Sequence, residues 1–250
     1  MRKLIKLVII VCVTLLLIPT TVLVAIIGWF IWPYEYEMDL PGPRELAAIS
    51  TASPVCSSGR ERSYALLTDI PPIVRSAFLA VVEPDFYERP RINPFVEFAA
   101  ALLGRRPRGS PMSEAIARCL IQSSTKCCKN QLDWHVATVV VLRRVESALT
   151  KDIIFELYLN ETWFNRRAFG VRAAADAYFG KSLSDLALDE VAYIAALSKD
   201  PSLARRNNER GAHLRNWVID RMENRGIISA AQAASAKQEP LQLREVSSPI

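Results

Sequence analysis

The chain has 250 residues and a formal net charge of +5 at pH 7, and half of its residues are hydrophobic. This length allows one membrane segment and one domain of about 200 residues, which is large enough to bury a core. We therefore expect no second large catalytic domain within these residues.

Residues 7–32 form an almost continuous apolar run. About 20 apolar residues are enough to cross a bilayer core, so we predict a transmembrane signal anchor within residues 1–36. The run is preceded by basic residues and followed by aromatic ones: Arg2, Lys3 and Lys6, then Trp29, Trp32, Tyr34 and Tyr36. The positive-inside rule and the aromatic belt predict a cytoplasmic N-terminus, a single pass through the inner (cytoplasmic) membrane and a periplasmic domain. The lipid bilayer is then a partner, and nucleic acid is not, because this topology removes the domain from it.

Residues 37–69 are polar and interrupted by prolines, and we expect them to be a connector. Four cysteines follow the predicted anchor: Cys56, Cys119, Cys127 and Cys128. In an oxidising compartment they favour one structural disulfide, which we expect to join Cys56 to the loop at Cys127 and Cys128. Four cysteines allow three pairings, and the sequence does not choose among them. A zinc site formed by Cys127, Cys128 and His135 is a weaker alternative, since adjacent cysteines rarely chelate one metal.

The pattern is helical from residue 70 to 241, and strand-like alternation is scarce. A first helix is predicted from Ile73 onward. Further helices are predicted at 94–103, 112–122, 132–149, 153–159, 169–178, 186–197 and 208–224. Ser229 is the predicted N-cap of a last short helix. These residues are therefore predicted to form one all-α domain, followed by a loose tail at 242–250.

The segment Lys151–Lys181 reads KDIIFELYLNETWFNRRAFGVRAAADAYFGK. It resembles the fourth signature block of the family 51 glycosyltransferases, the membrane enzymes that polymerise lipid II into peptidoglycan glycan strands. The following segment, LSDLALDEVAYIAALSKDPSLARRN, resembles the fifth block. The resemblance covers about residues 70–241 and implies a lysozyme-like, all-α glycosyltransferase domain behind one transmembrane helix.

The first block of that family reads Glu-Asp-x-x-Phe, and its Glu is understood as the general base for the acceptor hydroxyl. Anchoring this block on Phe86 places Val82 at the Glu and Glu83 at the Asp. Arg89 then falls at a family His. A one-residue deletion would instead make Glu83 the base, so both registers remain open.

The third block reads Arg-Lys-x-x-Glu, and its Glu is the second acidic site residue of the family. Counting back from Lys151 places Thr138 at that Glu and His135 at the Lys. Neither acidic position of the family therefore carries a carboxylate when the blocks are aligned without a gap. His135 is titratable, but a single histidine on a helix is usually structural or solvated.

The second block reads Gly-Gly-Ser-Thr-Ile-Thr-Gln-Gln, with a Lys three residues on. Here Ser110 is retained, Glu114 replaces the first glutamine and Arg118 stands at the Lys. The resemblance implies that these three residues bind substrate, with Arg118 keeping the cation that faces substrate phosphate in the family. Arginine binds phosphate in a bidentate manner. The change from the family's Lys to Arg118 therefore preserves anion binding better than it preserves the geometry of the contact.

We interpret the chain as a pseudoenzyme with degenerate catalytic motifs. Its domain would bind lipid II, a nascent glycan strand or another peptidoglycan synthase. The alternative is an active, inverting lipid II polymerase in which Glu83 is a displaced general base, assisted by Glu114 or Glu146. A divalent metal at the pyrophosphate is expected only in that case, and no metal ligand or other cofactor is assigned. A third class is a structural assembly factor that uses its outer helix faces.

Overall fold

The computed structural model describes residues 20–22, 24–26, 28–29, 32, 40–47, 63–91, 110–124, 127–202 and 208–244. The named helices are α2 (Pro43–Ala47), α3 (Pro72–Val82), α5 (Pro111–Ser123), α6 (Gln131–Ala148), α7 (Lys151–Glu161), α8 (Val171–Phe179), α9 (Leu188–Leu197), α10 (Asn208–Asn224) and α11 (Ala230–Gln238), with a 3-10 turn η2 at Leu67–Asp69. Strand-like pairing within the described residues is limited to an isolated antiparallel bridge between Trp163 and Phe169. The all-α prediction is confirmed for this part of the chain.

The predicted anchor at residues 7–32 and the predicted helix at 94–103 fall largely or wholly outside the described residues. Within the described part, no helix combines the length and the apolar character that a bilayer crossing needs.

Side-chain caps explain why several helices begin where the sequence predicts. Ser110 accepts a hydrogen bond from Ser113 N at 3.1 Å at the start of α5, and Asn130 accepts one from Asp133 N at 2.9 Å at the start of α6. Ser229 caps α11 as predicted, in a capping box with Gln232. Each cap satisfies a backbone N–H group that has no partner inside its helix.

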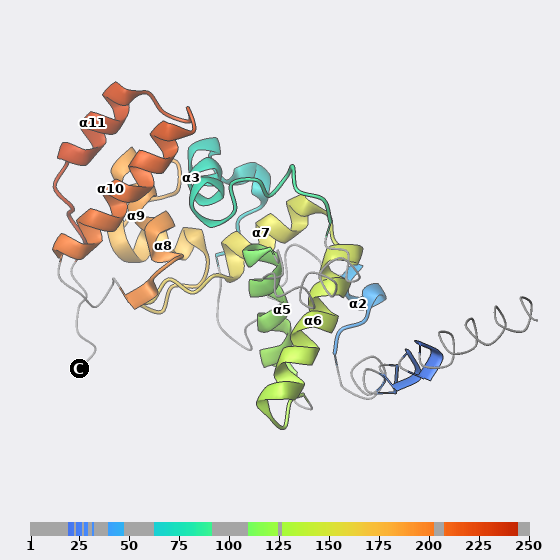
Figure 1. Cartoon of the computed structure of the whole chain (residues 1–250). Helices are drawn as coiled ribbons and strands as arrows, with labels where there is room; N and C mark the ends of the chain where they lie inside the picture. The colour runs from blue at the N-terminus through green and yellow to red at the C-terminus, as the bar shows by residue number, and fades with distance from the viewer. Residues whose placement is uncertain are drawn as a thin grey trace, which may run out of the picture.

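Helix α9 is the centre of one group of helices. It is buried at nearly every position from Val191 to Leu197, and it packs against α3, α8, α10 and α11. A helix that is apolar on all sides has to be surrounded in this way. Figure 1 shows this group together and, beside it, α5 and α6 running side by side, with α7 between the two groups.

Helix α7 holds the segment that enters the domain. Glu156 accepts from Tyr64 Oη at 2.9 Å and from Leu67 N at 2.6 Å. Asn160 accepts from Ala65 N and donates to Ala65 O, both at 2.8 Å. Ala65 is fully buried, so its peptide groups need these partners. We refer to Glu156 and Asn160 as the α7 clamp.

Two segments without helical periodicity are nevertheless docked on the domain. Within the expected connector, α2 places Leu46 in the core, and Arg144 donates to Pro41 O at 3.1 Å. Within the expected loose tail, Leu243 packs against the core and Arg244 N donates to Tyr178 O at 2.8 Å. Both segments are fixed through backbone carbonyls, which a sequence pattern does not reveal.

The expected disulfide between Cys56 and the loop after α5 is wrong. Cys127 is bonded to Cys128, its neighbour in sequence, and Cys119 is also disulfide-bonded. Cys128 adopts a left-handed backbone with φ 71°, which turns the chain sharply between α5 and α6. Because the two sulfurs are bonded to each other, they are not thiolates, and the zinc alternative with His135 fails as well.

Candidate functional site

The end of α3 and the turn that follows it bring acidic and basic side chains together. Glu83 is the C-terminal cap residue of α3, and the chain then turns so that Arg89 comes back toward it. Lys151, at the start of α7, fixes this turn by donating to Phe86 O at 2.6 Å, Tyr87 O at 2.8 Å and Arg89 O at 2.6 Å. The position of the Arg89 side chain is therefore set by helix α7 as well as by its own segment.

Five residues from three segments form what we call the carboxylate cluster: Glu83, Arg89, Ser110, Ser113 and Glu146. Arg89 donates from Nε to Glu83 Oε1 and from Nη2 to Glu146 Oε1, the latter at 2.6 Å. Ser110 Oγ donates to Glu83 Oε2 at 2.5 Å, and Ser113 Oγ donates to Glu146 Oε1. Burial opposes the charge on Arg89, but Glu146 and Glu83 outweigh it and raise the pKa of Arg89.

The cluster leaves Glu83 little freedom to act on a substrate. Its side chain is 10% exposed, and each of its two oxygens already accepts a hydrogen bond from the protein. Glu146 is 3% exposed and accepts from Arg89 and Ser113 through the same oxygen. The two carboxylates thus act as the acceptors of a satisfied ionic network that joins α3, α5 and α6.

Val82 and Thr138 are the residues that the ungapped alignment assigns to the family's two acidic positions. Both are buried. Thr138 Oγ1 donates to Trp134 O at 2.7 Å, one turn back on its own helix, as threonines within helices commonly do.

The predicted substrate-binding residues are divided between two places. Ser110 is fully buried in the carboxylate cluster and caps α5, so it lies together with Glu83. Glu114 and Arg118 lie elsewhere on α5, where they form an exposed i, i+4 ion pair. The guanidinium of Arg118 is stacked over the Trp134 ring at 5.0 Å, and its side chain remains 51% exposed. Arg118 is therefore accessible to an anionic group.

Sequence reasoning did not find that Arg89 bridges two glutamates that are 63 residues apart in the chain. The separation follows from their numbers, 146 − 83. No spacing in the sequence gives a signal for this bridge, because it depends on how α6 packs against α3 and α5.

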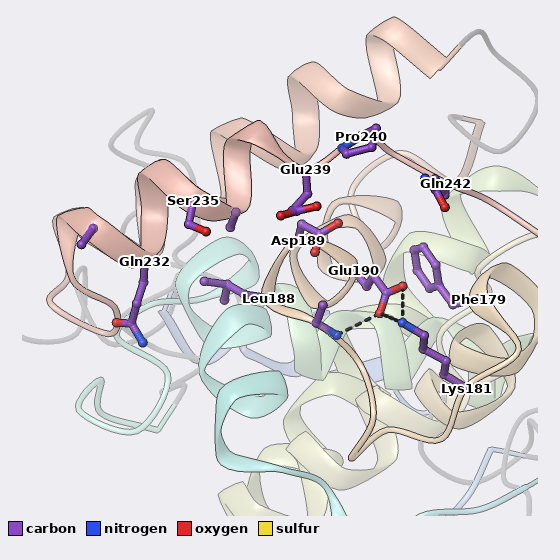
Figure 2. A pocket seen from close by; sticks show the side chains of 13 residues that line it. Phe179, Lys181, Leu188, Asp189, Glu190, Gln232, Ser235, Glu239, Pro240 and Gln242 are labelled. Carbon is purple, nitrogen blue, oxygen red and sulfur yellow. Dashed lines mark hydrogen bonds and ion pairs between the residues drawn. The ribbon is translucent and has the colours of Figure 1, made fainter.

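A separate pocket of about 700 Å³ lies between α9 and α11. Figure 2 shows Lys181 donating to both oxygens of Glu190, at 2.8 and 2.9 Å, while Ala187 N donates to the same carboxylate at 2.8 Å. Burial, followed by the charge of Glu190, raises the pKa of Asp189, which also lines this pocket. None of the residues predicted for the site lines it.

Residues 49–223 match the family model described as Transglycosylase. Penicillin-binding protein 1A of Rickettsia conorii (strain ATCC VR-613 / Malish 7) is 31% identical over 232 residues, which cover 85% of this chain and 29% of that protein. Penicillin-binding protein 1A of Escherichia coli (strain K12) is 34% identical over 189 residues, which cover 73% of this chain and 22% of that protein.

Among solved structures, penicillin-binding protein 1A from Haemophilus influenzae matches with 26% identity and a TM-score of 0.43, over 75% of this chain and 19% of that one. The chain spans less than a third of the length of the curated relatives named above.

Proposed function

We propose that this chain, which belongs to the transglycosylase family of family 51 glycosyltransferases, is a membrane-anchored pseudoenzyme of cell-wall assembly. Its periplasmic domain binds lipid II, a nascent glycan strand or another peptidoglycan synthase, and it does not polymerise lipid II. A single N-terminal transmembrane helix holds it at the inner membrane.

One observation carries the proposal: Glu83, the carboxylate next to the family's base position, is occupied on both oxygens by Arg89 and Ser110. Transfer of the sugar needs a base at the acceptor hydroxyl, and positioned proton transfer contributes about 10²–10⁴ in rate. Val82 supplies no base. Thr138, buried and bonded to its own helix, does not replace the second carboxylate.

Retained binding is supported by Arg118. It stands at the family's Lys position, its side chain is half exposed, and its ion-pair partner Glu114 is itself accessible to solvent. A surface ion pair of this kind contributes little to stability, so Arg118 can exchange Glu114 for a substrate phosphate at small cost.

The membrane anchor is supported by the helical residues described between 20 and 32. Val24 is 68% exposed and Trp29 is 80% exposed. Apolar side chains exposed to this extent in a helix need a covering, and acyl chains and the lipid interface provide one.

The test is glycan-chain synthesis from labelled lipid II, with full-length protein in detergent and Mg²⁺, and with precursor binding measured in the same samples. We expect binding without polymer, and we expect Arg118→Gln to weaken that binding. Gln122→Ala, which changes an exposed residue near the end of the same helix, is the matched control.

Polymer that disappears in Glu83→Gln but persists in Gln122→Ala would establish the alternative, an active polymerase with Glu83 as its base. Failure to bind any peptidoglycan precursor would instead favour the structural assembly role.

A further inference from the structure

We propose that the connection between α7 and α8, together with the first turn of α8, forms a binding site for a phosphate group that is separate from the carboxylate cluster. A cavity of about 840 Å³ lies here. Three arginines line it, Arg166, Arg167 and Arg172, and Asp176 is the acidic residue among its lining. None of these residues belongs to the carboxylate cluster or to the predicted substrate-binding set.

A tight loop presents two of the arginines. Phe164 N donates to Ala168 O at 2.9 Å and Ala168 N donates to Asn165 O at 2.7 Å, which closes the loop. Within it, Arg166 and Arg167 have left-handed backbones, with φ values of 45° and 60°. This conformation costs an ordinary residue about 1–2 kcal/mol, so it persists only where the surrounding structure imposes it.

The charge of the cavity is not balanced by the protein. Three arginines and one aspartate leave +3 − 1 = +2 in its lining. The aspartate, Asp176, is already paired with Arg244 at 3.4 Å. In the described part of the chain, the side chains of Arg167 and Arg172 have no hydrogen-bond or ion-pair partner. Both guanidinium groups are therefore available to a ligand.

Arg166 is the fixed member of the three. Its guanidinium lies over the Tyr178 ring at 4.5 Å, and its Nη1 donates to Arg244 O at 2.8 Å. Its Nε is buried and has no partner among the described residues. A buried donor without an acceptor is unfavourable, and an anion that reaches it removes that penalty.

These features favour phosphate. Guanidinium groups match phosphate oxygens in a bidentate geometry, and a charge of +2 matches a dianion. The N-cap of α8 is Gly170, which offers no side-chain acceptor to the first-turn N–H groups, and Arg172 and Ala173 in that turn line the cavity. These N–H groups and the helix dipole add to the attraction for an anion. The phosphate can come from a lipid headgroup or from a free phosphate ester, and the two sources are distinguished by experiment.

The experiment uses the full chain in neutral detergent and isothermal titration calorimetry at constant ionic strength. One probe is inorganic phosphate, and the other is dihexanoyl phosphatidylglycerol. The test variant is Arg167→Gln/Arg172→Gln, and the matched control is Arg225→Gln, which removes an exposed arginine that pairs with Asp85 at 3.7 Å. Because Arg167 and Arg172 have no partner among the described residues, we expect the test variant to fold with an unchanged Tm.

We expect saturable binding of at least one probe, weakened about tenfold or more in the test variant and unchanged in the control. Tighter binding of the lipid identifies a headgroup site, and tighter binding of inorganic phosphate identifies a site for a free phosphate group. The proposal is overturned if neither probe binds saturably, or if the test and control variants bind equally well.

Discussion

Replacing Arg89 with methionine removes the cation that holds Glu83 and Glu146 together in the carboxylate cluster. Methionine keeps most of the apolar volume of the arginine stem, so the main change is the loss of charge and of the hydrogen bonds that Arg89 donates to Glu83, Glu146 and Pro90 O. Ser110 and Ser113 still donate one hydrogen bond to each carboxylate. The variant therefore isolates the effect of two buried negative charges that have lost their cation.

The expected cost is about 3 kcal/mol in the free energy of unfolding. Removing one partner of a buried ion pair costs about 3–5 kcal/mol, because the remaining charge stays buried without compensation. The lower end of that range applies here, since the Arg89 side chain is 16% exposed and the two serines continue to solvate the carboxylates.

Urea unfolding of the full chain in neutral detergent, followed by far-UV circular dichroism, measures this cost. The measurement is made at pH 8, and wild type is unfolded under the same conditions.

The matched control is Arg89→Met/Glu83→Gln/Glu146→Gln, which removes the two negative charges as well and should recover most of the deficit at pH 8. A deficit below about 1 kcal/mol would refute the reasoning that the cluster is a buried ionic network.

Three further predictions concern stability, each measured by urea unfolding. Asn160→Ala leaves the buried peptide groups that it pairs with unsatisfied and should cost about 2–3 kcal/mol; a loss below 1 kcal/mol would contradict the clamp. Gly170→Ala should lower the free energy of unfolding by at least about 2 kcal/mol, because φ is 83° and the new Cβ would lie 2.8 Å from Asn160 O. Gly226→Ala should lower it by only about 1 kcal/mol, because φ is 68° but the space around it is open. Burial and then the hydrogen bond to Glu156 raise the pKa of Tyr64, so its stabilising contribution is present below pH 10 and is lost above it. The advantage of wild type over Tyr64→Phe should therefore fall between pH 9 and pH 11, and a constant difference would argue against this coupling.

The helices could be predicted because local signals agreed with one another. Ser229 caps α11 as expected, and α10 runs from Asn208 to Asn224, the bounds that the sequence indicates. In both cases a polar residue able to satisfy free backbone groups precedes or ends an apolar repeat. Such signals depend on residues three or four positions apart, so they are visible without a tertiary structure.

The candidate site could be predicted only in part. Anchoring the first block on Phe86 drew attention to Val82 and Glu83, and in the structure Glu83 lies with Ser110. The pairing of Glu146 with Arg89 depends on how α6 packs against α3 and α5, and no spacing in the chain encodes it. The bond between neighbouring cysteines was also missed, because it depends on a left-handed backbone at Cys128.

The α7 clamp also determines how the domain responds to force. Tension applied along the chain from its N-terminal part is taken first by the docked segment at residues 40–47, and beyond that segment it reaches the α7 clamp at Ala65, before α3 begins. There, two hydrogen bonds from Asn160 hold one peptide unit, while Tyr64 and Leu67 on either side are held by Glu156. All four bonds end on one helix, so a pull is shared among them and passed to α7 as a whole. A pull that reaches Tyr64 is thus resisted at α7, the helix that lies between the two groups of helices in Figure 1.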